Sequence, residues 1–517
     1  MNPGRGRTGA GTAAREYVEL VESSPLPGDV EWDDAPGQFK LYRGRPRIPL
    51  DETPGQVGEL LLDSYGVTRY RWTAADALRR LIGTRGAEPG GGAELARNSL
   101  RPVPSGGSRF PGEVYVVSGP GGALPTGVHH YDAAHHALVA LREGDWTGEL
   151  AAGLGAPAAR LPLTLLVTAF FWKNAFKYGE LTYRLCALDL GVLVGQVLAV
   201  APRLGPARVR YRFVDDDLDG LLRLDPMRES VYAAITIDEA PGRGPGPLRP
   251  LRDGTAEASR TGTASKSERE WTLDAQPLQA RVHRAARLPD ATEVRSAPAV
   301  PDHVTAPGPT VALPERAVDL LAGLHERRSS MGYFAPAELP AEPVSALLAA
   351  AAEGYRNDLA DESGASLRHT ALYCAVNRVS GVAPGVYRYR PGWSGGPGLE
   401  RVRTGDIGAE LQDSLLIKLF NMDHTGLCVY PVGHYGAGFD VHGDRWFRMQ
   451  NMEAGIAVQR LYLAAASLGL RCHASLGYDV QRTHRLLGLD GTGLSSLIQV
   501  MIGSGRAPGD FYEASWR

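Results

Sequence analysis

The sequence predicts an α+β protein made of two tandem copies of one unit. Matching segments occur in the same order in both halves of the chain, and the second set follows the first at a nearly constant distance. The matched pairs are 125–145 with 383–406, 183–191 with 447–455, 223–225 with 488–490, and 231–238 with 496–503. Matches repeated in one order are hard to obtain by chance, so they indicate a duplication. Each copy also combines alternating segments with long apolar segments, which are the patterns of strands and helices.

The elements of the first copy follow from these patterns. GEVYVVSG (112–119) alternates and is rich in β-branched residues, which predicts a strand that leads into a hairpin. LPLTLLVTAFF (161–171) is typical of a buried strand, and Leu181–Leu204 has apolar residues at helical spacing. A final strand at 231–238 closes the unit.

The second copy repeats this order. Strands are predicted at 370–379 and 426–435, a long helix at Trp446–Leu470, and a closing strand at 496–503. We therefore expect each unit to contain a mixed sheet packed by long helices. Two such units in one chain would form an intrachain pseudo-dimer.

Length and composition agree with this organisation. A chain of 517 residues favours two or more domains. Its 63 Gly and 37 Pro exceed average usage, which suggests linkers or tails around the folded units. The 55 Lys+Arg against 58 Asp+Glu give a net charge of −3, which does not support a nucleic-acid-binding protein. Four cysteines without a CxxC-type pair exclude a disulfide scaffold and favour buried free thiols.

Two regions look unstructured, residues 1–14 and about 240–311, because they are small, polar or rich in Pro and Gly. The expected organisation is an N-terminal tail (1–37), a first domain (38–240), a linker (241–311) and a second domain (312–517). No apolar h-region stands at the N-terminus, and the most apolar stretches are short or carry Asp189 and Gln196. We therefore expect a soluble, cytoplasmic protein without a membrane partner.

Histidine pairs in HHYDAAHH invite a metal-site interpretation. They are His129, His130, His135 and His136. Adjacent side chains in a hairpin point to opposite faces, and the repeat partner at 387–390 is YRYR, which has no ligand. We favour a solvated hairpin and expect no metal.

Several loops combine small residues with cations, a pattern that suits an anion or a planar ring. Pro104, Ser105, Gly106 and Gly107 form a PSGG loop preceded by Arg101. In the second copy, Arg327-Arg328-Ser329-Ser330 offers guanidiniums and hydroxyls to a phosphate group. Leu476-Gly477-Tyr478 lies between a strand and a helix, and Arg506 follows the last strand. Each signal alone fits an ordinary turn or a charged helix end equally well.

WKNAFKYGE (172–180) is a sharper feature because Lys177 and Tyr178 follow a buried strand and precede a long helix. A Lys whose pKa is lowered by burial, or a Tyr whose pKa is lowered by that Lys, can act as a general base near neutral pH. The alternative from the residues alone, a surface Lys and a core Tyr, is the more common arrangement.

Taken together, RPVPSGGSRFPGEVYVV, the GVHHYD hairpin and FKYGELTYRLCALDLG resemble the SagB/ThcOx-type azoline dehydrogenases, a branch of the FMN-dependent nitroreductase superfamily. The resemblance runs from about residue 39 to the final strand and excludes the linker. It implies two tandem nitroreductase-like domains and oxidation of peptide thiazolines and oxazolines to thiazoles and oxazoles. The expected partners are an azoline-containing precursor peptide of a ribosomally made, post-translationally modified product and a cyclodehydratase, and a homodimer is allowed.

The resemblance also implies one FMN site that uses both copies. Arg327, Arg328, Ser329, Gly477 with its neighbours Leu476 and Tyr478, and Arg506 would come from the second copy. Arg101 and the PSGG loop (Pro104, Ser105, Gly106, Gly107) would come from the first, together with the catalytic pair Lys177 and Tyr178, either of which could be the base. The opposite site looks degenerate, because Arg212 and Phe213 stand where Gly477 and Tyr478 would repeat, and SLRH (366–369) stands near the PSGG position. Reduced FMN would be reoxidised by oxygen.

Two alternatives stay open at this stage. A generic nitroreductase or flavin reductase would use NAD(P)H and would need no Lys-Tyr pair. A flavin-less scaffold subunit would only support a heterocyclase. The complementary motifs of the two copies argue against the loss of flavin.

Overall fold

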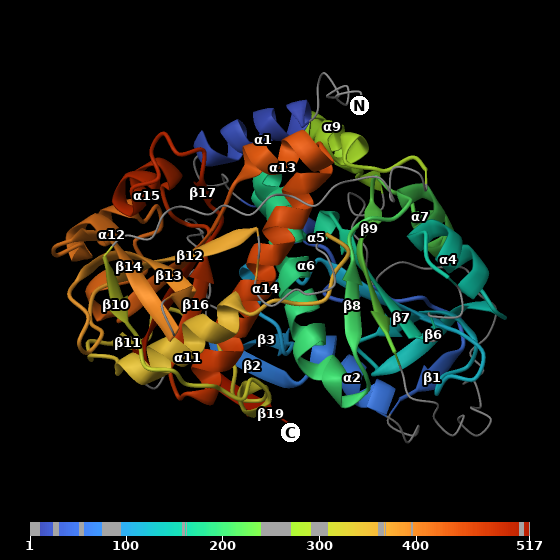
Figure 1. Cartoon of the computed structure of the whole chain (residues 1–517). Helices are drawn as coiled ribbons and strands as arrows, with labels where there is room; N and C mark the ends of the chain where they lie inside the picture. The colour runs from blue at the N-terminus through green and yellow to red at the C-terminus, as the bar shows by residue number, and fades with distance from the viewer. Residues whose placement is uncertain are drawn as a thin grey trace.

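The computed structural model describes residues 11–23, 30, 32–50, 56–74, 95–157, 161, 163–238, 270–290, 309–359, 367, 369–393, 396–505 and 511–515. Two sheets flank a central pair of long helices, and each sheet belongs to one half of the chain (Figure 1). This arrangement confirms the tandem α+β prediction.

The first sheet has the strand order β1-β6-β5-β4-β7-β9-β8. The second follows the path β10-β14-β13-β12-β15-β18-β11, with β16 paired to β18 and β17 paired to β15. The order β6-β5-β4-β7-β9 in the first sheet is therefore repeated as β14-β13-β12-β15-β18 in the second.

The strands of the first sheet are β1 Arg47–Pro49, β4 Gly112–Ser118, β5 Gly127–Asp132, β6 Ala137–Glu143, β7 Leu163–Phe170, β8 Ala207–Arg210 and β9 Glu229–Ile237. Those of the second are β10 Thr310–Ala312, β11 Phe334–Ala335, β12 Thr370–Val376, β13 Gly385–Trp393, β14 Gly396–Thr404, β15 Leu427–Gly433, β16 Arg471–Ser475, β17 Ser495–Ser496 and β18 Gln499–Gly505. The paired strands of the described residues are antiparallel, and parallel pairing is confined to isolated bridges such as Ser329 with Cys472. The predicted mixture of parallel and antiparallel pairing is therefore found only at these isolated bridges.

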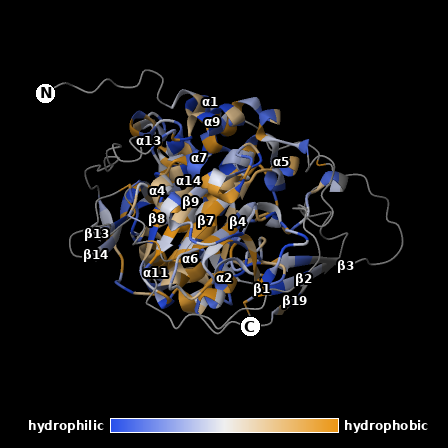
Figure 2. Ribbon diagram, turned by 90° about the vertical axis from the view of Figure 1, so that its right-hand side faces the viewer, coloured by the Kyte–Doolittle hydropathy of each residue, from blue (hydrophilic) through white to orange (hydrophobic). Residues whose placement is uncertain are grey.

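Helices cover the sheets and fill the space between them. The first unit contains α2 Gln56–Tyr65, α4 Thr147–Leu154, α5 Trp172–Tyr178, α6 Thr182–Val200 and α7 Asp215–Leu222. The second contains α11 Ala341–Ala352, α12 Gly408–Ser414, α13 Tyr435–His442, α14 Arg445–Ser467 and α15 Val480–Leu487. Hydrophobic segments concentrate at the centre, in α6, β7 and their neighbours (Figure 2).

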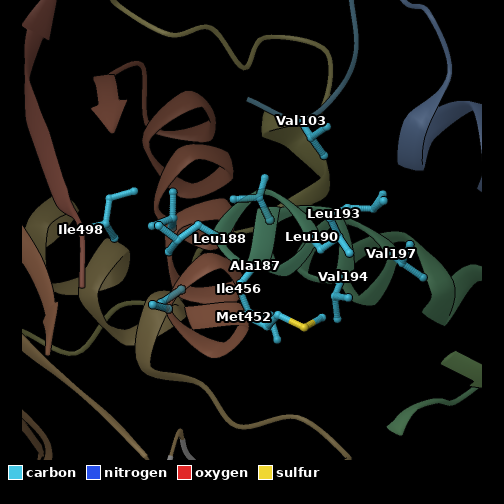
Figure 3. Packing of buried hydrophobic residues seen from close by; sticks show 14 of the residues in the cluster. Val103, Ala187, Leu188, Leu190, Leu193, Val194, Val197, Met452, Ile456 and Ile498 are labelled. Atoms are coloured by element: carbon cyan, nitrogen blue, oxygen red, sulfur yellow. The ribbon is translucent and has the colours of Figure 1, made fainter. Parts of the chain in front are cut away.

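The two long helices, α6 and α14, cross at a pair of glycines that occupy equivalent positions in the repeat. A Cβ at Gly191 would lie 2.1 Å from the carbonyl O of Met452, and a Cβ at Gly455 would lie 2.3 Å from that of Leu188. Leu188 and Met452 are also equivalent, so the crossing has two-fold symmetry. Apolar side chains from both helices surround it (Figure 3). Since neither glycine can be larger without moving backbone, the crossing point sets the relative position of the two units.

Part of the predicted linker is folded, so the expectation of an unstructured segment is wrong for residues 270–290. Helix α9, Pro277–Ala285, packs beside α1, Thr12–Ser23, on the same side of the molecule (Figure 1). Gln279 and Val282 are fully buried. The apolar positions are few and widely spaced, which is why composition alone missed this helix. The domain boundaries themselves stay a prediction.

A third, three-stranded sheet joins the C-terminal segment to the first unit, with the order β19-β2-β3 (Figure 1). Its strands are β2 Arg69–Ala74, β3 Leu95–Leu100 and β19 Phe511–Ser515. The second unit therefore reaches across and completes a sheet on the first.

The histidine pairs divide into two environments. His135 and His136 lie at the hairpin turn, but His129 and His130 are buried in β5, whose residues are covered on both faces. The expectation of a solvated hairpin is therefore wrong for the first pair. His130 Nε2 lies 3.0 Å from Glu113 Oε2. Among the described residues, no group of three His, Cys, Asp or Glu side chains is placed to hold a metal ion.

One helical stretch in the described part of the chain, Trp172–Arg203, is long and apolar enough to cross a membrane. Of its apolar window, 78% is buried inside the protein, where it packs against α14. Burial of this kind is typical of a core helix.

Candidate functional site

The PSGG loop is held by a buried carboxylate on α6. Ser105 Oγ donates to Asp189 Oδ2 at 2.6 Å, and the Gly106 N–H donates to the same carboxylate at 3.3 Å. Burial raises the pKa of Asp189 to about 7, against the lowering effect of these two hydrogen bonds. The loop that follows is strained, since Ser108 and Phe110 have φ values of 56° and 51°. Asp189 therefore fixes a loop that would not adopt this shape alone.

Lys177 and Tyr178 lie directly against this loop, as the sequence hypothesis requires. A Cβ at Gly107 would lie 2.4 Å from Tyr178 Oη and 2.8 Å from Lys177 Nζ. The backbone of Gly107 has φ 57°. Glycine is the residue type that suits both this conformation and the close approach of the Tyr178 and Lys177 side chains. The contact with Lys177 and Tyr178 therefore explains why residue 107 is a glycine.

The two groups of this pair have opposite electrostatic properties. Burial and the nearby guanidinium of Arg109 lower the pKa of Lys177 to about 8. Burial and the charge of Asp189 raise the pKa of Tyr178 well above its usual value. Near neutral pH, a fraction of Lys177 is therefore a neutral amine, whereas Tyr178 stays a protonated phenol.

Arg327 connects the second unit to the chain just before the PSGG loop. Its Nε donates to the Pro102 carbonyl at 2.9 Å, and its Nη2 donates to the Arg101 carbonyl at 2.6 Å. The structure thus brings the RRS segment and the PSGG segment together across the two units. Arg101 itself is buried, with its guanidinium 4.1 Å from the ring centre of Tyr65 in its own unit.

Arg328 belongs to a cation cluster that the sequence analysis missed. Glu513 of β19 pairs with Arg328 at 2.7 Å, with Arg71 at 2.6 Å and with Arg69 at 3.5 Å. Burial, Arg327 and Arg328 all act to lower the pKa of Arg69, which is 3% exposed. An arginine stays protonated in proteins, so three guanidiniums gather around the carboxylate of Glu513. Such a cluster favours an anion.

The other predicted site residues of the second unit lie along β16 and the turn after it. Ser329 Oγ is 3.2 Å from Tyr462 Oη, and Gly477 donates its N–H to Ser475 Oγ at 2.9 Å. Tyr478 is buried and donates to the Ser496 carbonyl. Leu476 and Tyr478 line a cavity shared with the first unit. Arg506 lies outside the described residues.

The symmetry-related position in the first unit is closed by the protein itself. Phe213, which stands where Tyr478 would repeat, is fully buried beneath the guanidinium of Arg445 at 4.4 Å. The carboxylate of Asp215 accepts hydrogen bonds from Arg445 at 2.6 Å and from Arg448 at 2.7 Å. Burial opposes ionisation, but these guanidiniums lower the pKa of Asp215 to about 2. Among the described residues, the ring of Phe213 and this ion cluster therefore occupy the position.

The residues of the interface fit FMN on two observations. The guanidiniums of the cluster around Arg328 lie close together and suit a phosphate. The PSGG loop is a small-residue surface, where a Cβ at Gly106 would contact Leu185 at 3.2 Å and one at Gly107 would contact Tyr178. A surface of small residues and an anion site at one interface suit a cofactor with a flat ring and a phosphate group, as FMN has.

Comparisons with known proteins place the chain among nitroreductase-like proteins. Residues 324–505 match the model of the Nitroreductase family. A crystal structure from Anabaena variabilis, assigned to the nitroreductases, aligns with a TM-score of 0.74 and 22% identity, and the alignment covers 96% of this chain and 99% of that one. The second unit is therefore similar to a nitroreductase-family domain, and the whole chain has a nitroreductase-like fold.

Two curated relatives share shorter segments. The trifolitoxin-processing protein TfxB of Rhizobium leguminosarum bv. trifolii is 30% identical over 146 residues, which cover 26% of this chain and 38% of TfxB. MJ1384 of Methanocaldococcus jannaschii, assigned to the nitroreductases, is 34% identical over 99 residues, which cover 19% of this chain and 48% of MJ1384. The chain thus spans less than half the length of each of these relatives.

Proposed function

We propose that the protein is an FMN-dependent azoline dehydrogenase of the SagB/ThcOx type, which oxidises thiazolines and oxazolines in a peptide to thiazoles and oxazoles. The observation that carries the proposal is a lysine with a lowered pKa and a protonated tyrosine, held against the PSGG loop. A nitroreductase that only passes electrons from NAD(P)H needs no such base.

Residues of both units would hold the cofactor. Arg328 with the neighbouring arginines and Arg506 would bind the phosphate, and the PSGG loop and Gly477 would contact the flavin ring. When bound, FMN supplies the acceptor for the two electrons of the oxidation. One such site is proposed per chain, because Asp215 and Phe213 close the equivalent position.

Lys177 is proposed as the base that removes the ring proton of the azoline. Its neutral amine can accept a proton near pH 8, because burial and Arg109 disfavour the charged form. Tyr178 cannot share this role, since its raised pKa keeps the phenol protonated. Its hydroxyl is then a donor that orients the substrate beside Gly107.

The name of one relative supports a role in peptide processing. TfxB, to which the chain is similar, is a trifolitoxin-processing protein. We infer that the substrate of this protein is an azoline-containing precursor peptide of a ribosomally made product, that a cyclodehydratase supplies it, and that the reaction takes place in the cytoplasm.

A direct test is to purify the protein and incubate it with a thiazoline peptide in air without NADH. The proposal expects flavin absorbance and a product that lacks two hydrogens. A flavin-containing protein that reacts only with added NADH would indicate a generic reductase. A protein that retains no flavin under any condition would indicate a scaffold subunit.

Arg328→Ala is expected to weaken FMN binding roughly ten- to hundredfold, because one charge-assisted hydrogen bond to the phosphate is lost. Titration of the flavin-free protein with FMN measures the dissociation constant. Arg316→Ala is the matched control, since Arg316 forms an exposed pair with Glu342. Equal affinities of the two variants would count against the phosphate site.

The rate of oxidation is expected to rise with pH through about 8, because the active form of Lys177 is the neutral amine, which predominates above its pKa. Arg109→Gln removes a positive charge that lowers this pKa, so the rising limb moves to higher pH. A pH profile of kcat measures the shift, with Arg142→Gln as a distant control. An unmoved limb in Arg109→Gln would contradict the assignment of Lys177.

A further inference from the structure

A cavity of about 460 Å³ lies between the two units, beneath the end of α1. Helix α1 contributes Val21 and Glu22, the first unit contributes Leu181 and Arg184, and the second contributes the turn at 476–481. Leu181 follows Tyr178 by one helical turn, and Leu476 precedes Gly477 in the chain. The cavity therefore adjoins both parts of the proposed catalytic site.

Two buried polar atoms of residues that line this cavity have no hydrogen-bond partner within the described part of the chain. They are Nε of Arg184 and Oε1 of Glu22. Arg184 is only 3% exposed, and its Nη2 is already used by the carbonyls of Ser496 and Leu497. A buried donor or acceptor without a partner is costly, so one that borders a cavity can be satisfied by a ligand.

The repeat shows how the same place is filled in the other half. Arg448 is the counterpart of Arg184, and its Nη2 donates to the carboxylate of Asp215 at 2.7 Å. Val480, which lines the cavity, occupies the position of Asp215. In the first unit Asp215 thus supplies an oxygen acceptor to Nη2 of Arg448, although Nε of Arg448 has no partner among the described residues. At the equivalent place beside Arg184, the side chain is the apolar Val480 and there is free space.

The charge of the cavity indicates a neutral ligand. Burial acts against the charge of Arg184, and nearby acidic groups that include Glu22 raise its pKa again. Asp479, the third charged side chain of the lining, is paired with Arg482, so Arg184 and Glu22 are the cation and the acid that remain, and they balance. The ligand must therefore offer an oxygen acceptor to Arg184 and a hydrogen-bond donor to Glu22 without adding charge. A secondary amide carries these two groups on opposite edges.

We propose that this cavity binds a backbone amide of the peptide substrate, with its C=O on Arg184 Nε and its N–H on Glu22. The inference rests on the proposed function and assigns to α1, which lies outside both repeated units, a direct contact with the substrate. Such a contact would favour a peptide over a small nitroaromatic compound, which has no N–H for Glu22.

The test uses the holoenzyme and an end-capped thiazole peptide, the oxidised product, as a ligand that binds without reacting. Its dissociation constant is measured by calorimetry for the wild type, Glu22→Ala and Val21→Trp, which fills the cavity. Glu19→Ala is the matched control, because Glu19 is exposed on the same helix. Glu22→Ala is expected to weaken binding roughly ten- to hundredfold. The expected kinetic counterpart is a raised KM for the thiazoline peptide with little change in kcat.

The outcomes separate this inference from the proposed function. Unchanged binding in Glu22→Ala and Val21→Trp, or no binding to the wild type, overturns the amide site. Loss of flavin from Val21→Trp also overturns it, because the cavity would then hold the cofactor. A wild type that binds the peptide through Glu22 but never oxidises the thiazoline supports the amide site and refutes the dehydrogenase.

Discussion

Lys177→Ala is expected to slow azoline oxidation by about 10²–10⁴-fold, the usual contribution of a positioned general base. FMN should remain bound, since Lys177 is not among the residues proposed to hold the phosphate. The physical reason is the lowered pKa, which makes Lys177 the group of the pair that can be neutral near pH 8. Single-turnover rates with a thiazoline peptide measure the effect, and absorbance measures the flavin.

Tyr178→Phe should have a smaller effect, because it removes a hydrogen-bond donor and leaves the base. The double variant, Lys177→Ala with Tyr178→Phe, should form no azole while still retaining FMN. Methylamine in the buffer is expected to restore part of the rate in Lys177→Ala and to have no effect on Tyr178→Phe. Lys418→Ala, at an exposed lysine, controls for a general loss of charge. If the double variant oxidises azolines at the parent rate, the catalytic assignment is wrong.

The repeat was the part of the fold that could be predicted best from sequence. Strands such as β4 and β7 and helices α6 and α14 carry regular patterns, and their order recurs in both halves, so each copy supports the other. The juxtaposition of Lys177 with the PSGG loop is consistent with the motif-based hypothesis, and the contact at Gly107 gives it a physical reason.

Other parts of the site could not be predicted because they depend on contacts between distant segments. Arg69 and Arg71 lie on an unremarkable polar strand, and only the pairing of β2 with β19 brings Glu513 to them. Asp189 is a single acid in an apolar helix, and its role appears only when Ser105 is placed beside it. Helix α9 was missed because its buried positions are sparse within a Pro-rich and Gly-rich segment.

The two halves of the repeat differ at equivalent positions beside Arg184 and Arg448. Helix α9 and Asp215 fill the space on one side, where the Ala286 carbonyl accepts from Arg445 Nη1 at 3.0 Å. On the other side, α1 covers a cavity and leaves Arg184 without a carboxylate at hydrogen-bond distance among the described residues. Under the proposed function, one half is structural at this position and the other holds the binding site.

Gly191→Ala is expected to destabilise the protein by about 1–3 kcal/mol, the usual cost of overpacking a core. In an open helix the same change would gain about 1 kcal/mol from helix propensity. Here the new Cβ would lie 2.1 Å from the Met452 carbonyl O and 2.6 Å from its Cα. Backbone atoms cannot rotate away as a side chain can, so the two helices must separate, and overpacking outweighs the gain in propensity.

Thermal unfolding measures this effect, with Gly220→Ala in α7 as the matched control, since nothing lies within 4 Å of a Cβ at that position. Gly455→Ala should be destabilising like Gly191→Ala, because its Cβ would meet the Leu188 carbonyl at 2.3 Å in the symmetric contact. A Gly191→Ala variant as stable as Gly220→Ala would show that the crossing does not set the spacing of the units. Asp189 lies on α6 only two residues before Gly191, so any separation of the helices also shifts the carboxylate that holds the PSGG loop. FMN affinity is therefore expected to fall together with the melting temperature in both glycine variants, and to remain unchanged in Gly220→Ala.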